Sequence, residues 1–103
     1  MIKVMIERRV KRVEDLLPLL RELREAAMRS PGFVTGETLG SIEDKSVVVI
    51  IGTWQTLADW QEWEKSDTRG KLYQRIQPLL DTRPKVSIYE ALATETKGQL
   101  VEL

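Results

Sequence analysis

Residues 47–51 form the feature that most constrains how this chain folds. The run contains only β-branched apolar residues, namely Val47, Val48, Val49, Ile50 and Ile51. A strand with one solvated face alternates apolar and polar residues, so an unbroken apolar run predicts a strand that is buried on both faces. In a chain of 103 residues, one layer of helices covers only one face of a sheet. We therefore expect a second copy of the chain to cover the other face, giving a homodimer through the sheet.

The rest of the chain alternates between strand and helix patterns. Alternating apolar residues predict a first strand over residues 2–10. Leucines at helical spacing follow, and we expect this helix to begin near Asp15 as its N-cap and to end at residues 30–32. Three further strands are predicted over residues 33–41, 46–54 and 85–94, together with a helix that opens at Thr56, breaks near Ser66 and ends near Gln77.

The predicted element order is β-α-β-β-α-β. With right-handed crossovers this order corresponds to an α+β, ferredoxin-like fold, with four antiparallel strands under two helices. Residues 1–94 then make a single domain, and residues 95–103 a short C-terminal tail. This fold carries RNA-binding modules, metabolite sensors and enzymes, so it does not decide the function.

The composition excludes several classes of function. Sixteen basic residues balance sixteen acidic ones, so no net field attracts nucleic acid or an anionic membrane. The strand over residues 46–54 is aliphatic where RNA-binding modules of this fold expose stacking aromatic residues. The chain contains no Cys and no His, which removes Cys/His metal sites and Ser-His or Cys-His catalysis. We expect a cytoplasmic protein without membrane segment, metal or cofactor.

Arg8 departs from the pattern of the first strand. It continues the apolar row of Ile2, Val4 and Ile6, which is expected to face the helices. Its guanidinium would then enter the cleft between sheet and helices, where it could bind a carboxylate, phenolate or enolate, or stabilise an oxyanion. The alternative is a structural arginine paired with Glu7, Glu37 or a helix carboxylate. The residues alone leave both interpretations open.

Aromatic residues supply the other candidate site groups. Trp60 and Trp63 are three residues apart, so both overhang one side of the same helix. Trp54 and Trp60 fit the role of core anchors that bury a large apolar area. Tyr73 and Tyr89 could hydrogen-bond a ligand, although a half-buried tyrosine more often bonds to water or backbone.

Five short motifs, in order and spacing, resemble one protein family. They are Glu7-Arg8-Arg9-Val10, Ser30-Pro31-Gly32-Phe33, Gly36-Glu37-Thr38-Leu39, Thr53-Trp54 and Trp63-Glu64-Lys65-Ser66-Asp67. Together they resemble the antibiotic biosynthesis monooxygenase domain, over about residues 2–92. The resemblance implies a ferredoxin-like subunit whose sheet pairs with that of a second subunit in a dimeric α+β barrel. It also places Trp63 in the ligand pocket.

Members of that family include cofactor-independent oxygenases of anthrones and quinols, and also haem-degrading enzymes. The haem-degrading members use an Asn, a Trp and an iron-binding His, and the matching positions here are Arg8, Trp63 and Tyr73. Only the Trp is retained, which disfavours haem degradation. The resemblance therefore implies a cofactor-independent monooxygenase of a small aromatic or quinol-type substrate, with Arg8, Trp63 and Tyr73 lining the pocket.

Two alternatives stay open at this point. One is a non-catalytic dimer that binds a small apolar ligand, which the lack of a recognisable general base favours. The other, weaker one is a haem-binding protein. For the dimer itself, we expect that lysine at Val48 or Ile50, whichever faces the partner, produces monomer or insoluble protein.

Overall fold

A computed structural model describes residues 1–102 of the chain. In chain order its elements are β1 (Ile2–Arg9), α1 (Val13–Met28), β2 (Phe33–Gly40), β3 (Val47–Trp54), α2 (Leu57–Glu64), α3 (Asp67–Ile76), the 3-10 turn η1 (Gln77–Leu79), β4 (Lys85–Glu90), β5 (Ala93–Thr96) and β6 (Gln99–Glu102). The predicted β-α-β-β-α-β order is confirmed, with the second helical region split into α2 and α3 at Ser66.

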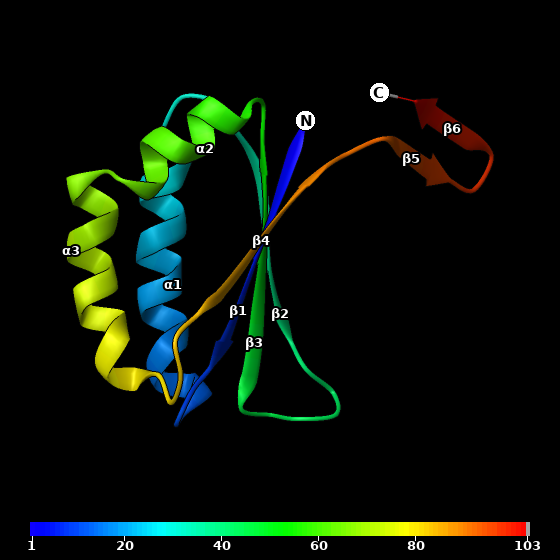
Figure 1. Cartoon of the computed structure of the whole chain (residues 1–103). Helices are drawn as coiled ribbons and strands as arrows, with labels where there is room; N and C mark the ends of the chain where they lie inside the picture. The colour runs from blue at the N-terminus through cyan, green and yellow to red at the C-terminus, as the bar shows by residue number, and fades with distance from the viewer. Residues whose placement is uncertain (103) are drawn as a thin grey trace.

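The first four strands form one antiparallel sheet in the order β2-β3-β1-β4. Figure 1 shows this sheet nearly edge-on, with α1, α2 and α3 all on one side of it. The other face of the sheet carries no helix within residues 1–102. This is the predicted ferredoxin-like α+β arrangement, and it creates a single sheet–helix interface in which a site can lie.

The strand register decides which side chains enter that interface. Val4, Ile6, Arg8 and Val10 of the β1 region are buried under the helices. Because directly opposed residues of antiparallel strands share a face, the pairings of Arg8 with Val48 and of Ile6 with Ile50 turn both β3 residues toward the helices. The expectation that Val48 or Ile50 faces a partner subunit is therefore wrong.

Val47, Val49 and Ile51 are the β3 residues on the open face. In the single chain these three side chains are half-buried, because neighbouring strands shield them only from the sides. Among the described residues nothing lies over them. The apolar run thus has one face in the core of this chain and the other on an uncovered sheet surface.

Two element boundaries differ from the predictions. Helix α1 begins at Val13 with Arg12 as its N-cap, not at Asp15, and Pro18 consequently lies in the second turn. Proline at this position removes the backbone hydrogen bond to Glu14, and both Glu14 and Pro18 are exposed residues of the helix. Strand β4 ends at Glu90, opposite Ile2, because β1 begins there and supplies no further partner.

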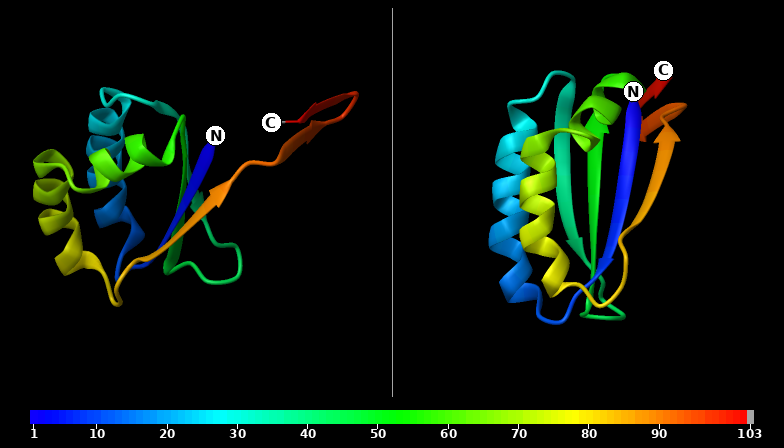
Figure 2. Two further views of the ribbon diagram at one scale, coloured as in Figure 1. Left: turned by 45° about the horizontal axis from the view of Figure 1, so that its top comes forward. Right: turned by 60° about the vertical axis from the view of Figure 1, so that its left-hand side comes forward.

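The predicted tail is a small hairpin. Strands β5 and β6 pair with each other and not with the main sheet, and the hairpin projects away from the domain in Figure 1 and in the left view of Figure 2. Leu103, the last residue of the predicted tail, lies outside the described residues. None of the helices formed by residues 1–102 has the length and apolar character needed to cross a membrane.

Candidate functional site

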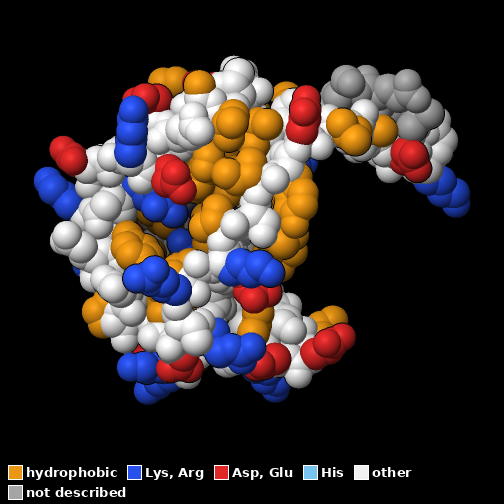
Figure 3. Space-filling model, in the orientation of Figure 1, with side chains coloured by type: hydrophobic (Ala, Val, Ile, Leu, Met, Phe, Trp, Pro, Cys, Tyr) orange, Lys and Arg blue, Asp and Glu red, His pale blue; other side chains and the backbone are white. Residues whose placement is uncertain are grey.

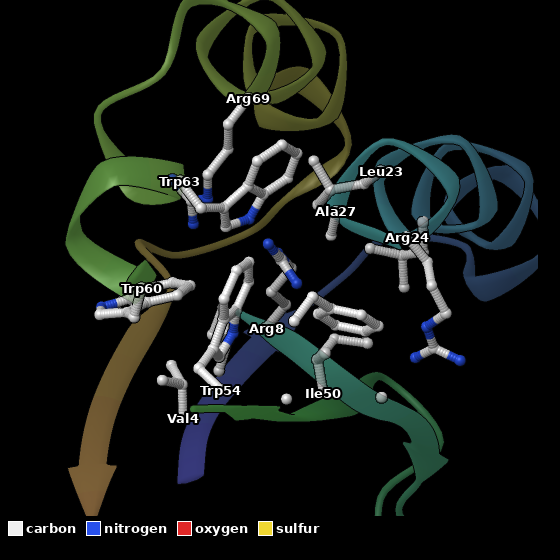
Figure 4. A pocket seen from close by; sticks show the side chains of 15 residues that line it. Val4, Arg8, Leu23, Arg24, Ala27, Ile50, Trp54, Trp60, Trp63 and Arg69 are labelled. Carbon is white, nitrogen blue, oxygen red and sulfur yellow. The ribbon is translucent and has the colours of Figure 1, made fainter. Parts of the chain in front are cut away.

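A cavity of about 60 Å³ lies between the sheet and the helices. Its walls come from β1, β2, β3 and all three helices, so residues far apart in sequence meet there (Figure 4). The lining residues are mostly apolar and aromatic: Val4, Ile6, Leu20, Leu23, Ala27, Phe33, Gly36, Ile50, Gly52, Trp54, Trp60 and Trp63, with Arg8, Arg24 and Arg69. Within the described part of the chain, these three arginines are the only charged side chains in the lining.

Arg8 is the most unusual of these residues. It is 1 % exposed, and its Nε, Nη1 and Nη2 atoms are all buried without a hydrogen-bond partner among residues 1–102. Its neighbours along the helix-facing row of β1 are apolar. The predicted alternative of a structural arginine paired with Glu7, Glu37 or a helix carboxylate is therefore wrong for this chain. A buried, unpaired guanidinium is a strong donor that the fold itself does not use.

The surroundings of Arg8 lower the pKa of its guanidinium. Its pKa is lowered from the ordinary value of arginine to about 10, first because burial disfavours the charged guanidinium and second because Arg69 is also positive; Tyr73 acts in the opposite direction. At neutral pH the side chain is still fully charged. The cavity therefore holds a permanent positive charge in apolar surroundings, where an anionic oxygen would interact with it strongly.

Aromatic rings form one wall of the cavity. Trp54 lies at the centre, with Phe33 edge-on at 5.2 Å, Trp60 edge-on at 6.0 Å and Trp63 stacked at 6.3 Å between ring centroids. Trp54, Trp60 and Trp63 are all nearly fully buried. The wall is therefore a packed cluster of rings, which suits it to hold a flat apolar ligand in one orientation.

Arg69 is a cavity residue that the sequence analysis missed. Ser66 caps α3 by accepting a hydrogen bond from the Arg69 backbone N–H at 3.2 Å, which places Arg69 in the first turn of that helix. Its guanidinium carbon lies 5.5 Å from the ring centroid of Trp60. The sequence feature that could have indicated the position of Arg69 was the predicted helix cap at Ser66. The direction of the side chain depends on the angle between α2 and α3, which no sequence pattern reports.

Arg24 is bound differently. Its Nη2 donates a hydrogen bond of 2.7 Å to Oγ1 of Thr38 on β2, in an exposed position. In Figure 4 its guanidinium points away from Arg8, toward the edge of the cavity. Arg24 therefore closes one side of the cavity and already has a partner, whereas Arg8 has none.

Of the three residues predicted to line the pocket, two do so and the third does not. Arg8 and Trp63 both line the cavity, and Figure 4 shows the Arg8 side chain extending toward the Trp63 indole. Tyr73 lies on α3, is half-buried and does not line the cavity. It lies close enough to act on the pKa of Arg8 and of Arg69, and it raises both. Trp60, expected only as a core anchor, contributes to both the core and the cavity wall.

The cavity is small for a ligand site. An apolar cavity of about 150 Å³ binds benzene, and pockets for larger ligands span about 300–1,000 Å³. At about 60 Å³ the cavity admits an aromatic ring only if a side chain of its wall moves. Arg69 is one of the half-buried lining residues, with Leu23, Phe33 and Ile50 among the others. Figure 3 shows basic side chains set back in a hollow beside a broad apolar surface.

Comparison with protein families identifies one match. Residues 1–75 match the sequence model of the family described as antibiotic biosynthesis monooxygenase. A search of curated proteins finds no match.

Comparison with solved structures finds several with the same fold. A structure described as an antibiotic biosynthesis monooxygenase superimposes with a TM-score of 0.79 at 22% identity, covering 88% of this chain and 98% of the other. SnoaB from Streptomyces nogalater, described as a cofactor-independent oxygenase, gives 0.83 at 13% identity, covering 95% and 97%. A conserved protein from Methanosarcina mazei Go1 gives 0.79 at 19% identity, covering 85% and 89%. At these identities the likeness is one of fold.

Proposed function

Because this chain belongs to the antibiotic biosynthesis monooxygenase family, we propose that it is a cofactor-independent monooxygenase that acts on a small aromatic or quinol-type substrate. The observation that carries the proposal is Arg8, a buried guanidinium without a protein partner in a cavity lined by tryptophan rings. The fold that it shares with SnoaB, a cofactor-independent oxygenase, agrees with this activity.

The chemistry needs a substrate that supplies its own electrons. An electron-rich phenol or quinol, once ionised, reacts with dioxygen directly: one oxygen atom enters the substrate, two hydrogens leave the substrate with the other oxygen atom as water, and all four electrons that reduce dioxygen come from the substrate. Arg8 would stabilise the substrate anion. Trp63 and Trp54 would hold the ring, and the apolar walls would exclude water. Arg8 and Trp63 are thus the proposed catalytic residues, and Tyr73, which lies outside the cavity lining, is not among them.

The proposal includes a homodimer formed through the open face of the sheet. Val49 and Ile51 lie at the centre of that face and are half-buried in the single chain. A second copy placed face to face would cover them and form the dimeric α+β barrel that the family resemblance implies.

A second candidate function is ligand binding without catalysis. It is favoured by the absence of a carboxylate, among the residues that the structure describes, from the cavity lining. Such a protein would bind the same small aromatic anion and release it unchanged.

Oxygen consumption tests the proposed activity. Wild type, Arg8→Ala and Trp63→Phe are compared with a panel of anthrones and hydroquinones, and Arg21→Ala, an exposed arginine on α1, is the control. We expect at least one substrate to react faster with protein. Arg8→Ala should lower that rate by about 10²–10³-fold, the usual cost of an oxyanion-stabilising donor. Trp63→Phe should have a smaller effect, since a ring remains.

The same assay distinguishes the monooxygenase from the non-catalytic binding protein. If no substrate reacts faster with protein than without it, the monooxygenase proposal is wrong. Saturable binding of the same compounds without oxygen uptake would support the non-catalytic alternative.

A further inference from the structure

Arg8 and Arg69 approach the same part of the cavity from opposite sides. Arg8 extends from β1 in the sheet and Arg69 from the first turn of α3, and in Figure 4 both side chains reach toward the indole of Trp63. Their charges influence each other, since Arg69 lowers the pKa of Arg8. Two like charges in an apolar cavity repel each other unless an anion lies between them.

Fold stability does not explain Arg8, which has no partner within residues 1–102. Arg69 has a cation–π contact with Trp60, but it places a positive charge in the first turn of a helix, where the helix dipole favours negative side chains. Burial lowers the pKa of Arg69, with Glu64 acting in the opposite direction, and the ion pairs of the described structure do not include Arg69. The pair is better explained by a ligand that supplies the missing negative charge.

The charged and titratable groups around the pair are few. Tyr73 on α3 and Glu64 at the end of α2 act on it electrostatically, and Arg24 from α1 lines the same cavity but is bonded to Thr38. Within the described part of the chain, Arg8 and Arg69 are therefore the two lining arginines whose guanidinium groups have no hydrogen-bonded or ion-paired partner, next to a wall of tryptophan rings. Together they match an aromatic ring that carries a negatively charged oxygen.

We propose that Arg8 and Arg69 form one anion-binding site that selects the ionised form of an aromatic ligand, so that a phenolic substrate is bound as its phenolate without a general base in the cavity. The O–H bond of the phenol breaks, its proton passes to solvent water, and no bond to carbon changes. This inference rests on the proposed function for its substrate class. It assigns to Arg69 the role of second binding residue beside Arg8.

The test uses 4-nitrophenol, whose phenolate is coloured, with the full-length protein under anaerobic conditions. Titration with pH at saturating protein should show a bound phenol that ionises at least one pH unit lower than free 4-nitrophenol. This shift means that phenolate binds at least tenfold more tightly than phenol. Arg8→Met and Arg69→Met should each remove most of the shift, while the exposed control Arg21→Met should retain it.

Three further ligands test whether the site is specific for an aromatic anion. Nitrobenzene, which cannot ionise, should bind wild type and Arg69→Met equally, which shows that the variant cavity is intact. Benzoate should displace 4-nitrophenolate, and inorganic phosphate should not, because phosphate has no ring to pack against Trp63. If Arg8→Met fails to fold, Arg69→Met and Arg8→Lys still test the pair, and Arg8→Lys should retain part of the shift.

The inference is overturned if wild type binds phenol and phenolate equally, if it does not bind 4-nitrophenol at any pH, if Arg69→Met keeps the full shift, or if phosphate displaces the ligand as well as benzoate does. These outcomes are separate from failure of the proposed activity. Phenolate selectivity without oxygen uptake by any substrate would uphold the anion site and reject the oxygenase. Turnover without anion selectivity would do the reverse.

Discussion

Along β1, Val4, Ile6 and Val10 bury apolar side chains beneath the helices, and Arg8 occupies the same row. A buried charge without a partner destabilises a folded protein by several kcal/mol. For Arg8, the lowered pKa of about 10 corresponds to a destabilisation of the charged form of about 3 kcal/mol. A residue that weakens the fold and faces a cavity is typical of a binding or catalytic site, where function is retained at the expense of stability.

Replacing Arg8 by Met should therefore make the protein more stable while abolishing anion binding. We expect the free energy of unfolding to rise by about 1–4 kcal/mol at neutral pH, measured by urea denaturation at one fixed protein concentration. The folded-state pKa lies below the unfolded one, so the penalty in wild type is complete below about pH 10 and is relieved as the pH rises from there to the ordinary pKa of arginine. The gain should shrink over that range. A less stable Arg8→Met protein would indicate a structural role instead.

The junction between α2 and α3 connects local sequence to the site. Helix α2 ends at Glu64, one residue after Trp63, and α3 starts again after the Ser66 cap. The Ser66 hydroxyl also donates a hydrogen bond of 2.7 Å to the carbonyl of Trp63. One serine thus bonds to the backbone of both Trp63 and Arg69, and so sets the positions of two cavity residues.

Replacing Ser66 by Ala should disturb the fold and the site together. Loss of an N-cap costs about 0.5–2 kcal/mol, and without it the first turn of α3 frays and Arg69 loses its position. We expect a lower free energy of unfolding and a smaller ionisation shift of bound 4-nitrophenol. Ser66→Thr, which retains the capping hydroxyl, is the matched control. Unchanged phenolate selectivity in a destabilised Ser66→Ala protein would show that the cap does not position Arg69.

The molecule as a whole is one sheet with helices on a single side (Figure 1). Its open face carries apolar side chains, with Met5 at 37%, Leu39 at 43% and Tyr89 at 54% exposure near Val49 and Ile51. Two carboxylates lie on the same face, Glu7 opposite Val49 and Glu37 opposite Ile51. At the end of the face, Lys3 donates a hydrogen bond of 2.8 Å to Thr53. A face that combines an apolar row with charged groups of both signs is suited to association with a second sheet.

Lysine at Ile51 should therefore break the proposed dimer. A charge at the centre of a self-complementary interface appears twice, once from each subunit, so its effect is doubled. We expect wild type to have the mass of a dimer in sedimentation equilibrium, and Ile51→Lys to be monomeric or insoluble. Leu17→Lys, at a 45% exposed apolar residue of α1, should remain dimeric. A soluble Ile51→Lys protein with unchanged dimeric mass would contradict the interface.

Local pattern was sufficient for the element order, the capping roles of Thr56 and Ser66, and the inward direction of Arg8, because each depends on neighbours only a few residues away. Strand register was not predictable, since it arises from pairing between distant segments, and this is why Val48 and Ile50 were placed on the wrong face. For the same reason, Arg69 was not predicted as a cavity residue. It lines the same cavity as Arg8 only because α3 packs against the sheet. That packing joins segments more than fifty residues apart, and it arises from hydrophobic burial, which no local motif encodes.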